Sequence, residues 1–418
     1  MNLIYLLTQL LIIISLFLGF IWLYYLIYLD LEEKKRVQVF PTVTIAVPAH
    51  NEEETIAHTL DSIFSLNYPK DKLKVIVIND GSKDNTGKIL KEYKKKHQNL
   101  IIIDKKINEG KAKGLNDALS ITDTEFFACV DADSTLDKNS LRNNVKYFYN
   151  VDGTLKKNVA AVISVVKVKN PDNWLGYAQK IEYQIMSLYR KLFAYANFLN
   201  VTPGVLSVYR TEILRDVNGF DEKSITEDFE VAMKIVKNHY KIEMSTESIA
   251  FTNVPLTFKS WWKQRIRWYR GFIETTAKHK DLIFSKEHGA FGIFYIPVTI
   301  IAPFVLFLSI SLILYKMYLE FSRFLFKLIF APKTIEWFHF QTIEEYILDT
   351  NFYITIPLVI LFFIFAYTLI RSFFFAEEKF NVKTFIGILI YLYVYPYLTF
   401  LQWMQAIYLY IRKKEKKW

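Results

Sequence analysis

The chain of 418 residues is 52% hydrophobic and 17% aromatic, yet 22% of it is charged, a combination that neither an ordinary soluble domain nor a pure membrane bundle shows. This composition predicts a soluble domain joined to several membrane spans, and it excludes disordered, collagen-like and disulfide-scaffold proteins. The net charge of +10 indicates an anionic partner, with phospholipid headgroups, nucleotides and nucleic acid as open alternatives, and the single cysteine, Cys129, allows no internal disulfide.

The first predicted element is a membrane-spanning helix. No charged residue occurs from Leu3 to Leu29, a run longer than the roughly 20 residues that a bilayer requires. A signal peptide is the alternative, but it would have a basic start and a small-residue cleavage site, which this segment lacks. Lys34, Lys35 and Arg36 follow, so the positive-inside rule places the N-terminus outside and the next segment in the cytosol. We therefore assign residues 1–30 to an N-terminal transmembrane helix.

The second predicted unit is a cytosolic α/β domain that covers residues 31–255. Runs rich in β-branched residues predict strands at Val43–Val47, Lys74–Ile78, Leu100–Ile103, Glu125–Val130 and Val159–Val166. Helical patterns between them predict helices at Glu53–Leu66, Asn85–Lys96, Lys111–Ser120 and Lys138–Tyr149. This alternation is typical of a mostly parallel, doubly wound sheet, in which ligands bind at the carboxyl ends of the strands.

The remainder of the chain is predicted to contact the membrane. Residues 256–288 are predicted to form amphipathic interface helices, and residues 289–418 a transmembrane region of about three spans. The apolar stretches are Ala290–Tyr315, Phe352–Ile370 and Phe385–Ile411, and the mixed segment Lys316–Asn351 is expected at an interface. Four spans would return the C-terminus to the outside, whereas the basic tail from Arg412 predicts the inside. The sequence leaves this conflict open.

Polar residues that could carry chemistry follow several predicted strands. Asp131 and Asp133 come directly after a strand, and such oxygen ligands suit Mg²⁺ or Mn²⁺, although an Asp-x-Asp pair alone is more often a turn cap. Asp80 ends another strand and either accepts a hydrogen bond from a nucleobase or ribose or simply forms a turn. Asn51 and Glu52 have helix capping as their alternative.

Two further motifs precede the C-terminal spans. Thr226–Asp228 opens a helical pattern and is a good helix cap, but a carboxylate there is also a candidate general base once its pKa is raised. Gln264–Trp268 lies in the amphipathic, aromatic segment Phe258–Phe272, which is typical of a membrane-surface helix. In a compatible functional interpretation, Arg267 meets a diphosphate and Trp268 presents its ring to a sugar.

Together these motifs resemble the processive membrane glycosyltransferases of family 2, the group of the cellulose, chitin, hyaluronan and poly-N-acetylglucosamine synthases. The likeness spans nearly the whole chain. The matching segments, in order, are Pro48–Glu52, Asp80–Ser82, Asn108–Lys111, Asp131–Asp133, Thr202–Gly204, Thr226–Asp228 and Gln264–Trp268. The resemblance implies a glycosyltransferase A-type fold embedded between transmembrane helices, with a nucleotide-diphosphate sugar as donor.

The resemblance also implies a role for each matching residue. The catalytic base would be Asp228, with Glu227 as the second carboxylate beside it. The donor would be bound by Ala49, Glu52, Asp80, Lys111, Asp131, Gln264, Arg267 and Trp268. The acceptor would be bound by Thr202, Pro203, Gly204 and Trp268. The metal, Mg²⁺ or Mn²⁺, would be held by Asp133 and Asp131.

The activity so implied is inverting transfer of a hexose or N-acetylhexosamine from a UDP-linked donor to a growing polysaccharide, by a multi-pass protein of the cell membrane whose catalytic domain faces the cytosol. The alternatives are transfer of one sugar to a polyprenyl phosphate or glycolipid, and a nucleotide-binding transporter or scaffold. The expected partners are a nucleotide sugar, a carbohydrate or lipid-linked acceptor and membrane lipids. Nucleic acid is not expected, because no aromatic residues interleave in stacking positions in the lysine-rich stretch Lys88–Lys113, which favours a solvated helix face. The sugar, the linkage and the oligomeric state stay open.

Overall fold

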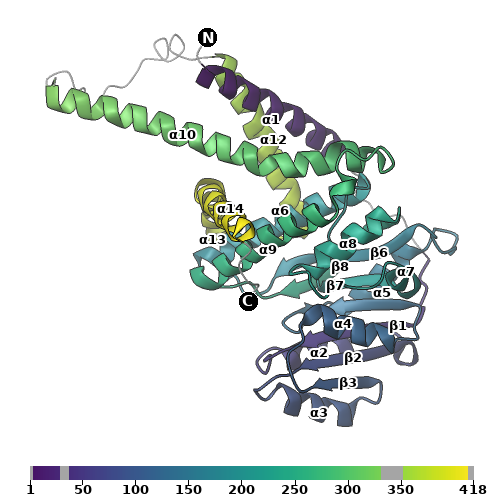
Figure 1. Ribbon diagram of the computed structural model, residues 1–418. Helices are drawn as coiled ribbons and strands as arrows, with labels where there is room; N and C mark the ends of the chain where they lie inside the picture. Colours follow the sequence, from purple (N-terminus) through teal and green to yellow (C-terminus); the bar gives the residue numbers. More distant parts are fainter. Residues whose placement is uncertain (1–2, 29–36, 331–351, 413–418) are drawn as a thin grey trace.

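A mixed eight-stranded sheet forms the centre of the protein in the computed structural model, which describes residues 3–28, 37–330 and 352–412 (Figure 1). Its strands are β1 (Val43–Ala49), β2 (Leu73–Asp80), β3 (Leu100–Lys105), β4 (Phe126–Val130), β5 (Thr135–Leu136), β6 (Val159–Val168), β7 (Val205–Arg210) and β8 (Lys241–Thr252). Their order is β3-β2-β1-β4-β7-β6-β8-β5. The first four are parallel, and β7 runs antiparallel to both β4 and β6.

Helices cover both faces of this sheet. Those of the central domain are α2 (Ile56–Phe64), α3 (Thr86–Lys96), α4 (Lys111–Ser120), α5 (Ser140–Val145), α6 (Trp174–Tyr195), α7 (Thr211–Asp216), α8 (Glu227–Lys237) and α9 (Phe258–Lys278). Apolar side chains of α2, α3 and α5 pack in one core, on one face, while those of α4, α7 and α8 pack in a second core on the other. The two cores arise because successive side chains of β1, Val43 and Thr44 onward, point to opposite faces.

The predicted α/β alternation is confirmed from β1 to β6. All five predicted strands lie within or beside observed ones, and the four predicted helices coincide with α2 to α5 to within a few residues, except that a 3-10 turn at Lys146–Phe148 ends the last of them. The sequence patterns did not identify α6, β7 or β8. Because β7 runs against its neighbours, the sheet is mixed, although most of its strand pairs are parallel, as expected.

The apolar helices gather at one end of the domain (Figure 1). They are α1 (Leu3–Tyr28), α10 (Ile296–Phe330, entered through a π-helical turn at Phe291–Tyr295), α12 (Phe352–Ala376), α13 (Val382–Tyr393) and α14 (Tyr395–Ile411). Among the described residues three helices are long and apolar enough to cross a membrane, and the α13–α14 pair, bent by 49°, would be a fourth if it forms one span. α1 packs against α12.

Some expectations about the membrane region fall outside this description. The helix that contains the predicted span Ala290–Tyr315 continues to Phe330, through the first part of the segment expected at an interface. The rest of that segment, residues 331–351, lies outside the described residues, as do the basic residues Lys34–Arg36 and the tail beyond Arg412.

Two long helices join the sheet to the apolar helices. α6 packs against α12 and α13, and α9 packs against α14. The guanidinium of Arg265 on α9 forms an ion pair with Glu182 on α6, and only 1% of the Arg265 side chain is exposed. A buried ion pair of this kind fixes the orientation of its two elements, since removal of either partner leaves an uncompensated charge. The ion pair therefore joins α6 and α9, and the two helices pack against the apolar helices.

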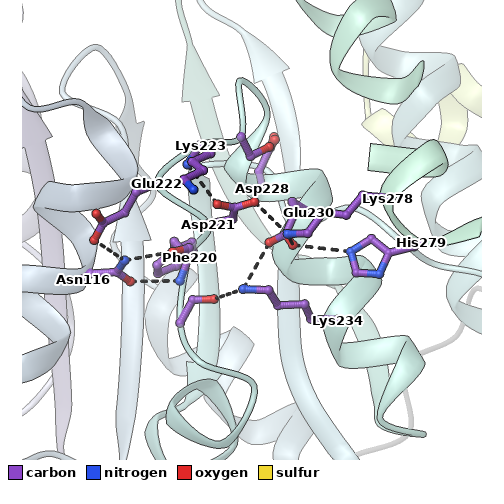
Figure 2. A network of polar contacts seen from close by, with 12 residues as sticks. Asn116, Phe220, Asp221, Glu222, Lys223, Asp228, Glu230, Lys234, Lys278 and His279 are labelled. Atoms are coloured by element: carbon purple, nitrogen blue, oxygen red, sulfur yellow. Dashed lines mark hydrogen bonds and ion pairs between the residues drawn. The ribbon is translucent and has the colours of Figure 1, made fainter. Parts of the chain in front are cut away.

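A second buried carboxylate, Glu230, fastens α8 to the end of α9. Lys278 and Lys234 pair with it, and the imidazole of His279 lies within hydrogen-bond distance (Figure 2). Lys278 also contacts Asp221 at 2.7 Å, so the network reaches the loop before α8. Burial alone would raise the pKa of Glu230, but hydrogen bonds from His279 and Lys278 outweigh it and lower that pKa. The carboxylate is thus held ionised at the helix junction.

We predict that Glu230→Ala lowers the free energy of unfolding by about 3–5 kcal/mol, because it leaves a cluster of cations without its buried counter-charge. The measurement is the apparent thermal unfolding midpoint in detergent. The matched control is Asp281→Ala, which removes the partner of Lys237 on the same helix; that pair is 2.7 Å long but exposed, and such pairs contribute about 1 kcal/mol or less. Equal shifts in the two variants would contradict the prediction.

Candidate active site

A cavity of about 690 Å³ lies at the carboxyl ends of the central strands, beneath α6 and α9. Its walls come from the ends of β4 and β8, the chain before β7, and helices α4, α6, α8 and α9. The predicted site residues that line it are Lys111, Asp131, Asp133, Pro203, Gly204, Glu227, Asp228, Gln264, Arg267 and Trp268. Residues more than 150 positions apart in the sequence therefore meet in one enclosed space.

Lys111 bridges two carboxylates at the floor of the cavity. Its Nζ lies 2.6 Å from Oδ1 of Asp131 and 2.7 Å from Oε1 of Glu227. Loss of hydration would lower the pKa of Lys111, but the charges of Asp131 and Glu227 outweigh it and raise that pKa well above its usual value. Lys111 begins α4 directly after Gly110, whose φ of +97° suits glycine. This turn carries the chain from the end of β3 back into the site.

The two adjacent acids at the start of α8 differ in their electrostatics. Loss of hydration and the charge of Glu227 raise the pKa of Asp228 to about 6. Burial would raise the pKa of Glu227 as well, but the ammonium of Lys111 outweighs it and lowers that pKa. The hydroxyl of Thr202 donates to the backbone carbonyl of Asp228 at 2.8 Å, which fixes the helix start. Asp228 is thus the carboxylate suited to accept a proton near neutral pH.

Asp131 and Asp133 together suit a divalent cation. Burial and the charge of Asp131 raise the pKa of Asp133 to about 6. The described residues contain no cluster of three His, Cys, Asp or Glu side chains that could hold a metal. An ion on this pair would therefore complete its shell with water and substrate phosphate oxygens, which is how Mg²⁺ is usually bound.

Gly204 makes room for the carboxylate of Asp131. Its carbonyl accepts a hydrogen bond from the Asp131 backbone N–H at 2.9 Å, which brings the two chains together. A Cβ at position 204 would lie 2.5 Å from both carboxylate oxygens of Asp131, a distance that real Cβ atoms do not adopt. Glycine at position 204 therefore leaves space for the Asp131 carboxylate. This is in addition to the contact with the acceptor substrate that the family resemblance implies.

Close approach of α9 to α8 places the Gln264–Trp268 segment over the cavity. A Cβ at Gly271 would lie 2.3 Å from the side chain of Thr226, so the two helices touch where α8 begins. The guanidinium of Arg267 donates to the carbonyl of Ile225 at 3.3 Å, just before the Thr226–Asp228 motif. Gln264, Arg267 and Trp268 thus line the same cavity as the acids, and their contacts with a diphosphate and an acceptor sugar stay predictions.

Four predicted residues are absent from the cavity lining. One is Thr202, which is buried beside the start of α8, and the other three lie at the ends of β1 and β2. Ala49 is buried where β1 ends. The carboxylate oxygens of Asp80 accept the backbone N–H groups of Glu109 and Gly110 at 3.0 and 2.8 Å, so Asp80 fastens the turn that leads to α4. Burial raises the pKa of Glu52. Their contacts with a uridine stay predictions.

The sequence analysis missed the cavity wall formed by α6 and the apolar helices. Tyr183, Arg190 and Phe193 of α6 line the cavity, together with Trp22 of α1 and Tyr295 before α10. The signal for α6 is its apolar spacing of three and four residues, at Leu175, Ala178, Ile181, Ile185, Leu188 and Leu192. No sequence signal joins these residues to the acids, because their proximity comes from tertiary packing alone.

Residues 44–217 match the family described as Glycosyl transferase family 2. The match lies within the central domain and covers its strands from β1 to β7. The chain is 34% identical over 241 residues to the poly-beta-1,6-N-acetyl-D-glucosamine synthase of Staphylococcus epidermidis, covering 57% of this chain and 56% of the relative. It is 31% identical over 274 residues to the probable glycosyltransferase YdaM of Bacillus subtilis strain 168, covering 63% of each. The chain thus matches between half and two thirds of the length of these curated relatives, and the expected resemblance to processive family 2 enzymes is confirmed.

The fold is also shared with a solved structure. The mannosyltransferase PcManGT from Pyrobaculum calidifontis, in complex with GDP-Man and Mn²⁺, superposes with a TM-score of 0.59 at 19% identity, over 92% of this chain and 99% of that one. The predicted glycosyltransferase A-type architecture of the family 2 domain is confirmed by this likeness together with the mixed sheet.

We predict that Gly204→Ala weakens Mn²⁺ binding and donor turnover at least tenfold without unfolding the domain, because the new methyl group displaces the Asp131 carboxylate from its place beside Lys111. Mn²⁺ affinity in the presence of UDP, followed by electron paramagnetic resonance, checks the first effect. The unfolding midpoint serves as the control. Unchanged Mn²⁺ affinity in a folded variant would show that Asp131 does not need this space.

Proposed function

We propose that the protein is a membrane-integrated, metal-dependent and inverting glycosyltransferase, which moves a hexose or N-acetylhexosamine from a UDP-linked donor to a growing polysaccharide. The observation that carries this proposal is the arrangement of charges in the cavity. Asp228, with its raised pKa, shares one enclosed space with the Asp131–Asp133 pair. A base and a site for a sugar diphosphate are thereby held close together, as group transfer requires. The similarity to poly-N-acetylglucosamine synthases supports a polymeric product.

In the proposed reaction Asp228 removes the proton from an acceptor hydroxyl. The hydroxyl oxygen then attacks the anomeric carbon on the face opposite the nucleoside diphosphate, whose bond to that carbon breaks, so the configuration inverts. Arg267 stabilises the negative charge that develops on the leaving group. A divalent ion held by Asp131 and Asp133 supplies further charge neutralisation when it is bound.

The remaining residues hold and enclose the substrates in this proposal. Trp268 offers its ring to the acceptor sugar, and the acceptor lies along Thr202–Gly204. Ala49, Glu52 and Asp80 receive the nucleoside at the ends of β1 and β2. Glu227 keeps Lys111 in place beside the donor diphosphate. The non-enzymatic alternative is a nucleotide-binding transporter or scaffold. Such a protein would not need a buried carboxylate with a raised pKa, as Asp228 has, beside the ligand.

We propose a membrane topology with three crossing helices. With α1, α10 and α12 as the crossing helices, a chain that starts outside ends inside, on the side of the catalytic domain. The α13–α14 pair then stays at one surface, where its bend of 49° and its contacts with α6 and α9 are consistent with a helix pair that does not cross. In this proposed arrangement the central domain lies in the cytosol, in agreement with the basic residues of the tail.

We predict that Asp228→Asn keeps donor affinity within about twofold and lowers kcat about 10²- to 10⁴-fold, which is the contribution of a positioned base. In the unchanged protein, kcat/KM should fall about tenfold per pH unit below pH 6, because Asp228 is then protonated and cannot accept the proton. Isothermal titration with UDP and a pH–rate profile check the two effects. Near-normal turnover of the variant, or a flat profile between pH 5 and 8, would remove Asp228 from the role of base.

The whole proposal is tested by a screen of UDP- and GDP-linked sugars for nucleotide release by the purified, full-length protein in detergent. We expect release from a UDP-hexose or UDP-N-acetylhexosamine, its loss with excess chelator and its return with Mn²⁺ or Mg²⁺. Asp133→Asn is the matched variant, since it removes one proposed ligand and should prevent the return. Full release in excess chelator would contradict metal dependence, and no release from any donor would contradict the function itself.

A further inference from the structure

Asn116 of α4 holds the backbone of the loop that leads to the two acids of α8. The Phe220 N–H donates to Oδ1 of Asn116 at 2.9 Å, and Nδ2 of Asn116 donates to the Phe220 carbonyl at 2.8 Å (Figure 2). The same Nδ2 also donates to the Glu222 carboxylate at 3.1 Å. One side-chain amide thus satisfies both backbone groups of a buried residue, as a neighbouring strand would do. Asn116 does not line the active-site cavity, so it can act on a reaction there only through this loop.

The loop lies tightly against the amide and the sheet. Gly219 adopts a φ of +54°, and a Cβ at that position would lie 2.6 Å from Oδ1 of Asn116, so the chain turns directly on the amide oxygen. The ring of Phe220 meets Phe127 of β4 at 6.5 Å and Tyr209 of β7 at 5.9 Å, measured between ring centroids. The beginning of the loop is therefore fixed between α4 and the sheet.

The same helix also holds the end of this loop. Lys111, the first residue of α4, forms an ion pair with Glu227 at 2.7 Å. α4 therefore contacts the chain at Phe220 and again at Glu227, on either side of the segment that leads into α8. Asp228 follows Glu227 directly, so two anchors on one helix set its place in the cavity. Loss of one anchor would allow the start of α8 to move.

The other contacts of the loop are made by lysines. Lys234 of α8 donates to the Gly219 carbonyl at 3.1 Å, and Lys278 of α9 pairs with Asp221 at 2.7 Å. A lysine ammonium is a point charge on a flexible stem, so it attracts the chain without fixing its orientation. The amide of Asn116 donates to and accepts from the same backbone residue, so it fixes both the position and the direction of the chain. Asn116 is therefore the contact that sets the geometry of the loop.

We propose that Asn116 is a positioning residue for Asp228: it fixes Phe220 against α4 and thereby holds the start of α8, with the carboxylate of the base, where an acceptor hydroxyl can lose its proton. The inference rests on the proposed function and adds to it a residue to which the family resemblance gives no role. Loss of the amide should leave Lys111 paired with Asp131, so donor binding is retained while the base is displaced. A displacement of about 1 Å can cost about 10²-fold in rate.

A double-mutant cycle with Asp228 tests this role. UDP release by the full-length protein in detergent is measured for the unchanged protein, Asn116→Ala, Asp228→Asn and the combination, with the UDP-linked hexose or N-acetylhexosamine that is turned over fastest. Asn116→Ala should lower kcat about 10- to 100-fold and change KM for the donor by less than about threefold. In the Asp228→Asn background the same substitution should lower kcat by less than about twofold, because a base that has been removed cannot be misplaced.

The outcomes of the cycle separate this inference from the proposed function. Equal losses of kcat in the two backgrounds, or a kcat that Asn116→Ala leaves unchanged, would overturn the inference and leave the proposed function intact. Near-normal turnover of Asp228→Asn alone would remove Asp228 from the role of base, and the inference with it.

Two further variants distinguish positioning from a general loss of structure. Lys113→Gln is the matched control, because Lys113 lies on α4 and contacts Glu222 only at 3.8 Å; its kcat should stay within about twofold. Asn116→Asp keeps the acceptor for the Phe220 N–H but cannot donate to the carbonyl, so its kcat should lie between those of the unchanged protein and Asn116→Ala. The cycle is repeated with this variant if Asn116→Ala fails to fold. Unchanged kcat in Asn116→Asp, or a kcat that follows the unfolding midpoint in every variant, would leave Asn116 with a structural role only.

Discussion

One cation between two carboxylates holds the candidate site together. Lys111 begins α4, Asp131 ends β4 and Glu227 begins α8, so a single ammonium joins three elements that are far apart in the sequence. The same contact makes the pKa values of the two acids at the start of α8 differ. Glu227 forms an ion pair with Lys111, whereas Asp228 forms none with the residues that the structure describes, and its pKa is raised to about 6. The site therefore obtains one fixed anion and one proton acceptor from neighbouring residues, which is the separation of roles that acid–base chemistry needs.

The sequence predicted the parallel half of the sheet well, because each buried strand there is a short apolar run followed by a turn. Polar residues after such runs, Asp80 and Asp131 among them, can be assigned to one edge of the sheet from the sequence alone. β8 was missed because Lys241–Thr252 mixes charged, polar and apolar residues without a clear alternation. β7 was missed although it is as long as β3, and its antiparallel direction depends on pairing with β4 and β6.

The sequence indicates which types of residue form the site, but not how closely other elements approach them. Gly204 and Gly271 each occupy a place where another element leaves no volume for a Cβ, namely the carboxylate of Asp131 and the side chain of Thr226. A lone glycine in a sequence indicates freedom of the backbone as readily as close packing, so neither contact can be read from it. For Asp80 the prediction was incomplete in a related way, since its carboxylate also fastens the turn at Gly110.

The cavity is built jointly by the sheet domain and the apolar helices. Its upper wall is built by α6 and α9, which are joined by the Arg265–Glu182 ion pair and rest on α12, α13 and α14. A further part of the wall, Trp22 and Tyr295, belongs to the apolar helices themselves. The space in front of Asp228 therefore depends on how these helices pack. The sheet could be predicted from local patterns, whereas the part of the cavity wall formed by α6 and the apolar helices depends on how the chain packs where the domain meets those helices.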